Sequence, residues 1–435
     1  MSKILFLHQN FPGQYLHLAQ ALRDRGDTIV AIGLETASEL AGITLHRYDP
    51  APTGIIPECH PLLSDSQTKV LRGAAVAQTI LKLIGEGFEP DLVIGHSGWG
   101  EMLALADILP GVPVIHHQEF VYNVKGADYG FDKEFHHPTW IDVTGVRIRR
   151  NFQLLALDNF TCATTSTWWQ WSSIPPAYRD RAVVVHEGID TTKITPEQPP
   201  GETGEITLSR DKVVLRPGDE VVTFVSRNLE PCRGFHIFMR SLALLQQLRP
   251  NMRAIIVGRD GKGYGSLPPD GGDWRTFMMR ELSSRIDSKR VHFVGQVPHS
   301  VLHRVFRLSA CHVYLTVPFV LSWSMLEAMA CGCVVVGSAT PPVQEMIKHA
   351  ENGILVDFLD HEALAKTVAK VLANPKDYMH LRQSARQTVV DRYDLHSVCL
   401  PKQIDMIERI LRGEIYPAEP LRPPAELESI LMNGT

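Results

Sequence analysis

Residues 319–336 read FVLSWSMLEAMACGCVVV and predict a loop, a helix that ends at Gly332, and a buried strand. Ser322 or Ser324 would cap this helix, so its free backbone N–H groups would face an anion. Glu327 lies about one turn into the otherwise apolar helix. A carboxylate among apolar side chains costs free energy unless it meets hydrogen-bond donors, and two adjacent ribose hydroxyls would supply them.

Short apolar strands alternate with helical patterns on both sides of this stretch. The predicted strands are residues 3–9, 28–33, 90–95 and 112–116 in the first half, and 221–225, 253–257, 291–294, 311–315 and 333–336 in the second. The predicted helices include residues 16–22, 100–109, 236–248 and 362–372. Continuous apolar strands between helices indicate parallel sheets covered on both faces. We therefore predict an α/β protein with two doubly wound lobes and a cleft between them.

The length of 435 residues fits two domains better than one hydrophobic core. Because residues 196–204 are rich in Pro and Gly, we place the linker there, between an N-terminal Rossmann-like domain at 1–200 and a C-terminal one at 201–395. Residues 396–435 would form a C-terminal helix and a Pro-rich tail, for which a return to the N-terminal lobe is one option. The weak periodicity of residues 413–435 predicts a surface tail.

The composition excludes several classes of protein. Apolar residues make up 44% and charged residues 21%, which is typical of globular proteins. The apolar runs are much shorter than the roughly 20 residues that a membrane-spanning helix requires. The apolar run near Met1 is too short for a secretory signal, so we expect a cytoplasmic protein.

Charge and cysteine usage indicate the kind of ligand. Residues 1–200 contain 22 acidic and 15 basic residues (−7), and residues 201–435 contain 26 and 28 (+2). This balance argues against a nucleic-acid partner and favours an anionic small ligand in the second half. The seven cysteines are scattered and odd in number, and the close pair Cys331 and Cys333 lacks further ligands at metal spacing. We therefore predict reduced thiols and no metal site.

Two arginines follow the predicted strand 221–225. Arg227 and Arg233 are six residues apart in the loop at the carboxyl end of that strand. Two guanidinium groups in such a position can each bind phosphate oxygens in fork geometry. On this segment alone, a pair of solvated loop arginines would be the commoner interpretation. The capped helix with Glu327 in the same half favours a phosphate site instead.

At this point the chain resembles the family 4 glycosyltransferases of GT-B fold over nearly its whole length. The sequence Leu326-Glu327-Ala-Met-Ala-Cys-Gly332 matches the family motif whose Glu binds the donor ribose, and Arg227 and Arg233-Gly234 match its Gly-Arg and Lys-Gly positions. The segment from Val291 to Val297 is similar to the turn that lies against the nucleobase. Asn352-Gly353 and His186-Glu-Gly188-Ile-Asp190 match two further motifs.

The resemblance implies a donor side in the second lobe and an acceptor side in the first. The implied donor-binding residues are Gly13, Arg227, Arg233, Gly258, Val297, Phe319, Ser322, Trp323, Ser324 and Glu327. The implied acceptor-side residues are His96, His116, His117 and Glu119, and the implied catalytic residues are Arg227, Arg233, His116, His117 and Glu119. His116, His117 and Glu119 compete for the place of the family's cleft-facing histidine. Adjacent strand residues point to opposite faces, so one of the two histidines should line the cleft.

The chain departs from the family at three positions. Phe319 replaces the glutamate that contacts the transferred sugar, so recognition of that sugar must differ or be absent. Ser322 replaces a glycine. Arg233 replaces a lysine and preserves its charge.

The resemblance implies a retaining transfer of sugar from a nucleotide diphosphate donor to a hydroxyl acceptor, without a metal or other cofactor. The acceptor could be a glycan, a lipid-linked group, a protein or a small molecule, in bacterial surface polysaccharide, glycolipid or glycoconjugate synthesis. Two alternatives are a non-catalytic GT-B scaffold that binds nucleotide sugar and a nucleotide-sugar isomerase or hydrolase. The basic run at residues 147–150 near Trp140 is a solvated helix face or, as the alternative, a peripheral contact with the cytoplasmic face of a membrane.

Overall fold

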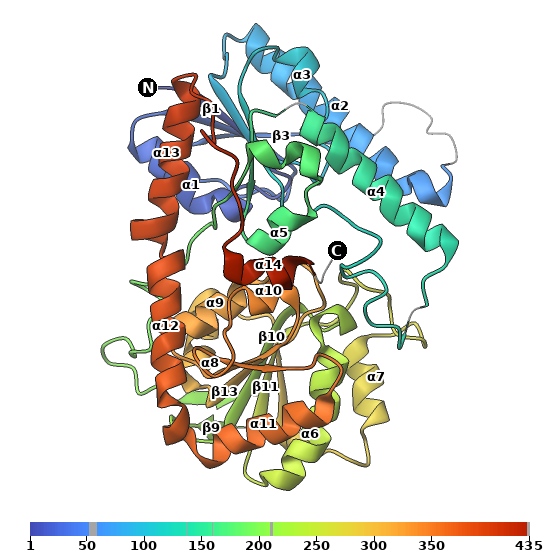
Figure 1. Cartoon of the computed structure of the whole chain (residues 1–435), viewed down its shortest axis with the longest axis vertical. Helices are drawn as coiled ribbons and strands as arrows, with labels where there is room; N and C mark the ends of the chain where they lie inside the picture. Colours follow the sequence, from blue (N-terminus) through green and yellow to red (C-terminus); the bar gives the residue numbers. More distant parts are fainter. Residues whose placement is uncertain (52–58, 136, 159, 209–211, 433–435) are drawn as a thin grey trace.

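The computed structural model describes residues 1–51, 59–135, 137–158, 160–208 and 212–432, which form two α/β lobes stacked along the long axis (Figure 1). The N-terminal lobe contains a seven-stranded parallel sheet in the order β3-β2-β1-β4-β5-β6-β7. Its strands are β1 (Lys3–Leu7), β2 (Thr28–Gly33), β3 (Thr44–Arg47), β4 (Leu92–His96), β5 (Val114–His117), β6 (Cys162–Thr165) and β7 (Ala182–Val184).

The C-terminal lobe contains a six-stranded parallel sheet in the order β12-β11-β10-β13-β14-β15. Its strands are β10 (Val221–Asn228), β11 (Arg253–Arg259), β12 (Val291–Gly295), β13 (Cys311–Tyr314), β14 (Val335–Ser338) and β15 (Ile354–Val356). In a separate two-stranded sheet, β8 (Ile206–Leu208) pairs antiparallel with β9 (Val213–Leu215). The predicted fold of two doubly wound lobes is therefore confirmed.

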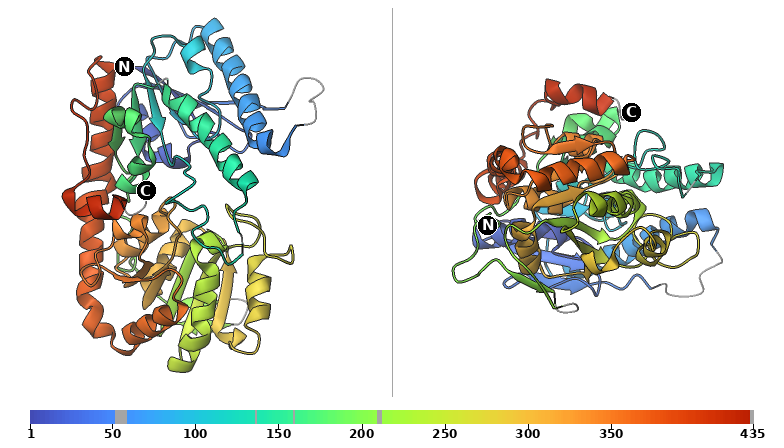
Figure 2. Two further views of the ribbon diagram at one scale, coloured as in Figure 1. Left: turned by 45° about the vertical axis from the view of Figure 1, so that its right-hand side comes forward. Right: turned by 90° about the horizontal axis from the view of Figure 1, so that it is seen from below.

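Helices cover both faces of each sheet (Figure 2). Those of the N-terminal lobe are α1 (Leu16–Asp24), α2 (Ser64–Gly85), α3 (Leu105–Ile108), α4 (Trp140–Asp158) and α5 (Trp168–Ser173). Those of the C-terminal lobe are α6 (Phe235–Leu248), α7 (Trp274–Glu281), α8 (His299–Leu308), α9 (Trp323–Ala330), α10 (Pro341–Gln344), α11 (His361–Ala373) and α12 (Met379–Tyr393), and the chain ends with α13 (Leu400–Leu411) and α14 (Ala425–Met432). Among the described residues, no helix combines the length and apolar character needed to cross a membrane.

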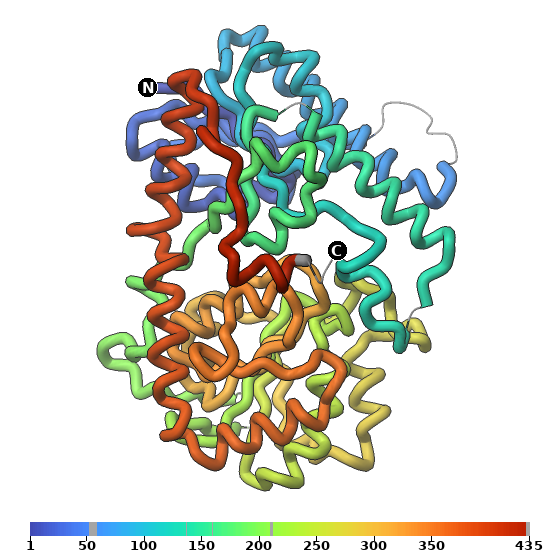
Figure 3. Tube along the Cα trace, in the orientation of Figure 1, coloured from blue at the N-terminus to red at the C-terminus, as the bar shows by residue number. Residues whose placement is uncertain are grey.

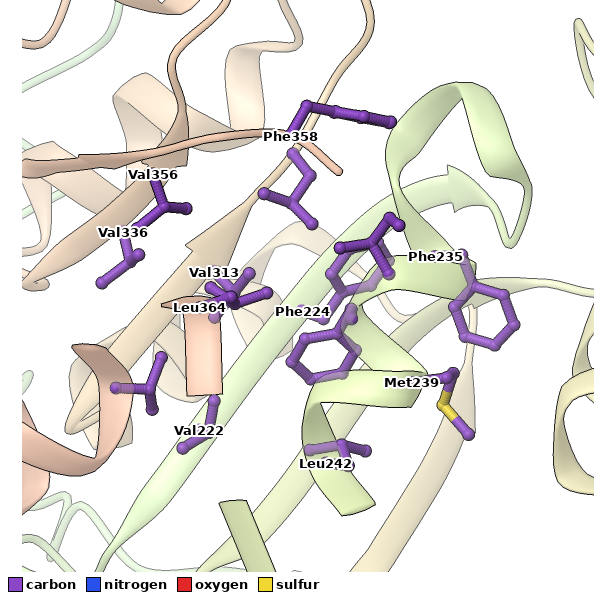
Figure 4. Close-up of a cluster of buried hydrophobic side chains, with 14 of the residues drawn as sticks. Val222, Phe224, Phe235, Met239, Leu242, Val313, Val336, Val356, Phe358 and Leu364 are labelled. Carbon is purple, nitrogen blue, oxygen red and sulfur yellow. The ribbon is translucent and has the colours of Figure 1, made fainter. Parts of the chain in front are cut away.

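The alternation of side chains along each strand builds two cores per lobe. On β10, Val222 and Phe224 belong to one buried cluster, and Val221 and Val225 belong to the cluster on the other face. Figure 4 shows the first of these clusters, in which Phe224 lies among side chains of α6 such as Phe235. Because the strands are buried on both faces, their sequences are continuously apolar.

The start of α6 depends on Gly234. Its φ of +67° lies in the left-handed region, and a Cβ there would stand 2.4 Å from Cβ of Leu315. Glycine therefore allows the chain to turn directly from the loop after β10 into the helix. This turn fixes the position of Arg233, the residue before it.

The predicted helix at residues 100–109 is wrong over its first half, because α3 begins at Leu105. Gly100 has a φ of +105°, and a Cβ there would lie 2.3 Å from the carbonyl oxygen of Lys69. Residues 99–104 instead form turns against α2. The close backbone approach, which the apolar pattern does not reveal, decides the conformation.

The C-terminal segment packs on both lobes (Figure 3). Helix α13 packs against α1, and Met406, Ile407 and Ile410 are buried in the core beneath β1. The prediction of a surface tail at residues 413–435 is wrong where the chain forms α14. Leu427 and Leu431 of this helix are buried near α5 and α10. Two leucines four residues apart on an eight-residue helix give too short a pattern to detect from sequence. Residues 433–435 of the predicted tail lie outside the described residues.

A buried carboxylate joins the two lobes. Glu345, just after α10, accepts hydrogen bonds of 2.8 Å from the backbone N–H groups of Trp168 and Trp169 at the start of α5. Burial raises the pKa of Glu345 to about 7, although these two N–H groups and Arg392 act to lower it. The interlobe contact is therefore sensitive to pH near neutrality.

The raised pKa predicts how stability depends on pH. The folded protein retains the Glu345 proton up to a pH near 7, whereas an exposed glutamate loses it near its ordinary value, so the stabilisation by this group falls as the pH rises through this window. The melting temperature of the wild type minus that of Glu345→Gln should therefore be larger at pH 5 than at pH 8. Thermal melts of both proteins between pH 5 and pH 8 check this prediction. A difference in melting temperature that does not change with pH would contradict it.

Candidate active site

A cavity of about 610 Å³ lies between the lobes at the carboxyl ends of both sheets. Of the residues predicted from sequence, the following line it: Gly13, His96 and Glu119 from the N-terminal lobe, and Arg227, Arg233, Gly258, Val297, Phe319, Ser322, Trp323, Ser324 and Glu327 from the C-terminal lobe. The structure thus brings together side chains from distant parts of the sequence in one cleft.

The two arginines of the cavity differ in how they are held. Arg227 is an exposed residue near the end of β10. Arg233 is anchored, because its Nη1 donates to Oγ1 of Thr316 at 3.0 Å and to the carbonyl oxygen of Val320 at 2.8 Å. Both positive charges face the same cavity, as a site for an anion requires.

The first turn of α9 also faces this cavity, through Ser322, Trp323 and Ser324. Of the two predicted capping residues, Ser322 is the N-cap, and its side-chain oxygen accepts from the N–H of Ser324 at 3.4 Å. The backbone N–H of Ser322 donates to the hydroxyl of Tyr314 at 2.7 Å. The positive end of the helix dipole therefore adds to the positive field of the arginines.

Glu327 is buried in α9, with 6% of its surface exposed. Its Oε1 lies 3.6 Å from Nδ1 of His299 and 3.7 Å from Nε2 of His303, both on α8. Burial raises the pKa of Glu327, but these two imidazoles lower it to about 2. The carboxylate is thus ionised at neutral pH and lines the cavity within reach of a ligand.

The N-terminal lobe contributes a group of histidines and glutamates. His96, at the end of β4, has Nε2 3.4 Å from Oε2 of Glu119, and His117, at the end of β5, has Nε2 3.5 Å from Oε1 of Glu187. Burial raises the pKa of Glu119, but His96, His117 and His8 lower it to about 2. Burial lowers the pKa of His117, which favours its neutral form. At His117, this side of the cleft therefore places a neutral imidazole beside the carboxylate of Glu187.

The three competing residues of β5 and its loop have different positions. Glu119 lines the large cavity, and His117 borders a small cavity beside it with Tyr15 and Glu187. The ring of His116 lies on the opposite face of β5, 6.2 Å from the ring of Phe160. The prediction that His116 could line the cleft is therefore wrong, because successive strand residues point to opposite faces and His117 is on the cleft side.

Several residues of the site were not predicted from the sequence. They are His8, Gln14, Trp99, Glu187, Glu230, Tyr264, His299 and His303. His8 lies near the carboxyl end of the first predicted strand, so the rule that ligands lie at the carboxyl ends of strands could have found it. His299 and His303 have the i, i+4 spacing that places two side chains on one helix face. Glu230 and Tyr264 lie in loops and gave no such signal.

Phe319 is part of an aromatic cluster that spans the lobes. Its ring is 5.2 Å from that of Phe120 in the N-terminal lobe and 5.2 Å from that of Tyr264. The guanidinium carbon of Arg233 lies 5.5 Å from the centre of the same ring. The position that holds a carboxylate in the resembling family is therefore apolar here.

Two family models match the chain in succession. The model of the glycosyl transferase family 4 group matches residues 25–194, and the model of glycosyl transferases group 1 matches residues 206–388. Together these ranges contain most of both lobes. The chain therefore belongs to the family 4 glycosyltransferases.

Curated relatives share part of the chain. A D-inositol 3-phosphate glycosyltransferase of Mycolicibacterium vanbaalenii is 29% identical over 222 residues, which are 50% of this chain and 46% of that protein. The enzyme of the same description from Streptomyces coelicolor is 23% identical over 295 residues, 65% of this chain and 60% of that protein. The chain thus spans about half the length of the curated relatives that it matches.

Solved structures share the fold. Sucrose-phosphate synthase from Thermosynechococcus elongatus superposes with a TM-score of 0.69 at 17% identity, covering 95% of this chain and 100% of that one. HepE of Anabaena, in complex with UDP-glucose, superposes with a TM-score of 0.64 at 17% identity, covering 94% and 100%. At these identities the likeness shows the fold, which is GT-B.

The contacts of Glu327 predict a pH-dependent stability. Because the pKa of Glu327 is lowered, its ionised form stabilises the fold at a pH above the ordinary pKa of glutamate, and this stabilisation is lost as the pH falls. Because the pKa of His299 is raised, its protonated form stabilises the fold at low pH, and this stabilisation is lost as the pH rises. The pair should stabilise the protein most between these limits. Glu327→Gln should therefore lower the melting temperature of the ligand-free protein more at pH 5.5 than at pH 8. An equal or smaller loss at pH 5.5 would contradict this account.

Proposed function

We propose that the protein is a retaining glycosyltransferase that moves a sugar from a nucleotide diphosphate donor to a hydroxyl acceptor without a metal ion. The observation that carries the proposal is the convergence of Arg227, Arg233 and Glu327 on one interlobe cavity. Two cations suit a diphosphate, and a buried, ionised carboxylate suits the two hydroxyls of a ribose. The UDP-glucose bound to HepE and the curated glycosyltransferases of the same family support a donor of this kind.

The proposed donor site stabilises the charge of the leaving diphosphate. The guanidinium groups of Arg227 and Arg233 and the first turn of α9 are positioned before the reaction, so they require little reorganisation as charge develops. Because these groups supply the positive charge themselves, the proposed reaction is metal-independent. Gly258 and Val297, which also line the cavity, would lie along the nucleoside.

The N-terminal lobe is the proposed acceptor side. With a pKa of about 2, Glu119 is a weak base at neutral pH, but it can accept a hydrogen bond from an acceptor hydroxyl. His96 supports its orientation. The weak basicity fits a retaining reaction in which an oxygen of the leaving diphosphate takes the proton of the incoming hydroxyl on the same face of the sugar.

The proposed setting is synthesis of a bacterial surface polysaccharide, glycolipid or glycoconjugate in the cytoplasm. On α4, the exposed Trp140, Arg147 and Arg149 would allow peripheral contact with an anionic membrane surface. One observation favours a second candidate, a non-catalytic nucleotide-sugar-binding subunit: the aromatic cluster of Phe319 occupies the place of a sugar-contacting carboxylate. Incubation with a panel of nucleotide sugars and hydroxyl acceptors separates the candidates, because only a transferase forms a glycosylated product.

The phosphate assignment is tested with Arg227→Ala. Because Arg227 is exposed, its loss should leave the fold unchanged while removing a charge-assisted contact of about 1.5–3 kcal/mol with a nucleotide diphosphate. The affinity for UDP or GDP is measured by calorimetry. Arg259→Ala, which removes an exposed arginine at the end of the neighbouring strand β11, is the matched control and should bind as the wild type does. Equal affinities of all three proteins would remove the assignment.

The metal-free reaction is tested by chelation. EDTA should leave sugar transfer at its original rate, because Arg227, Arg233 and the start of α9 supply the charge that a metal would otherwise provide. Transfer is measured as release of nucleotide diphosphate before and after removal of divalent ions. Loss of activity that Mg²⁺ or Mn²⁺ restores would show that the reaction depends on a metal.

A further inference from the structure

Two histidines and one glutamate meet at the edge of the cavity, on neighbouring helices. His299 and His303 are four residues apart on α8, and Glu327 is on α9. One side-chain nitrogen of each histidine and one oxygen of Glu327 all lie within 4.8 Å of one another. The carboxylate is buried, whereas the side chain of His299 is 75% exposed, so the group is accessible from the cavity.

The distances within this group are too long for hydrogen bonds. Nδ1 of His299 and Nε2 of His303 approach the same oxygen, Oε1 of Glu327, at 3.6 Å and 3.7 Å. A strong hydrogen bond between such atoms would be about 2.7–2.9 Å long. Nε2 of His303 is buried and has no hydrogen-bond partner in the part of the chain that the structure describes. Direct contact between these three side chains therefore leaves part of their hydrogen-bonding capacity unused.

The same distances fit a metal ion between the three side chains. Zn²⁺ binds histidine nitrogen at about 2.0–2.1 Å and carboxylate oxygen at about 2.0–2.2 Å in tetrahedral geometry, which places neighbouring ligand atoms about 3.4 Å apart. The two nitrogen–oxygen distances are only slightly longer than this. The i, i+4 spacing presents both imidazoles on one face of α8, as in known zinc sites on helices.

The donor set also selects the kind of ion. Two imidazoles and one carboxylate suit Zn²⁺ and similar divalent transition-metal ions, whereas Mg²⁺ and Ca²⁺ prefer oxygen ligands throughout. Three protein ligands leave a fourth position, which here would face the cavity because Glu327 and His299 both line it.

We propose that His299, His303 and Glu327 bind a divalent transition-metal ion such as Zn²⁺, and that this ion and a ribose exclude each other at Glu327. The ion would inhibit donor binding and is not a cofactor of the proposed transfer. The metal site stands on the geometry of the three side chains alone. The mutual exclusion rests on the proposed function, because it requires that Glu327 also binds the ribose.

The metal site is tested with Co²⁺ alone, since tetrahedral Co²⁺ absorbs visible light and replaces Zn²⁺ in sites of this kind. Titration of the ligand-free wild type should give an absorption that saturates at about one equivalent. The double variant His299→Ala/His303→Ala should lose this absorption, and His380→Ala, which removes an exposed histidine on α12, should keep it. No absorption in the wild type, or equal absorption in the double variant, would overturn the proposal.

Folding of the variants is checked by thermal melts. If the double variant does not fold, the single variant His299→Ala decides the question, because its side chain is largely exposed and its loss removes one ligand. The single variant should bind Co²⁺ at least about tenfold more weakly, a loss of about 1.4 kcal/mol. Unchanged affinity in a folded single variant would also overturn the proposal.

Mutual exclusion is tested with UDP or GDP, whichever stabilises the wild type. At a Zn²⁺ concentration about ten times its dissociation constant, the apparent affinity of the wild type for the nucleotide should fall about tenfold. The diphosphate itself chelates zinc, but this effect is equal in the double variant, whose affinity should fall much less. Equal losses in both proteins would overturn the exclusion. If neither nucleotide binds without zinc, the donor assignment fails, whereas the cobalt titration still decides the metal site.

Discussion

Parallel pairing of the strands is the constraint on which the rest of the structure depends. In each of the two parallel sheets every strand ends at the same edge, so the residues that follow different strands gather there. For this reason Arg227, near the end of β10, lies at the cavity edge of the second sheet, and His96, at the end of β4, lies at that of the first. A slip of β10 by one residue would exchange its two buried faces and turn Phe224 out of its core, so the register of the strand and the position of the arginine are fixed together.

The two sheet edges share a cavity because several contacts hold the lobes face to face. Glu345 of the C-terminal lobe accepts two backbone hydrogen bonds from α5 of the N-terminal lobe. From the N-terminal lobe, the ring of Phe135 packs against that of Trp274 in the C-terminal lobe, with 4.6 Å between the ring centres. Glu134 forms an ion pair with Arg240 of the C-terminal lobe. Helix α13 then returns to the first lobe. These contacts come from loops and from the chain end, and they determine the distance between the proposed donor and acceptor sides.

The sequence was most informative for functional residues whose position follows from the residues next to them in the chain. Arg227 lies near the end of an apolar strand and Glu327 lies in a capped apolar helix. The two signals together predicted a ligand site, which the segment of Arg227 alone would not have done. The partners of Glu327 could not be predicted from the sequence, because His299 reaches Glu327 only through the packing of α8 against α9. For His116 and His117 the alternation of strand side chains required opposite faces, but which face meets the cleft depends on the helices that cover the sheet.

Each lobe places an ionised carboxylate beside imidazole groups at the cavity, Glu119 in the first and Glu327 in the second. At Phe319, which lines the same cavity, the chain has a ring where the resembling family has a third carboxylate. Under the proposed function, a third negative charge there would lie close to the leaving diphosphate, and Arg233 would have to interact with both. With Phe319, Arg233 instead lies over an aromatic face that attracts its charge without neutralising it. Under the proposed function, Arg233 is therefore left for the phosphates, and recognition of the sugar shifts to the aromatic surface and to the side chains of the N-terminal lobe.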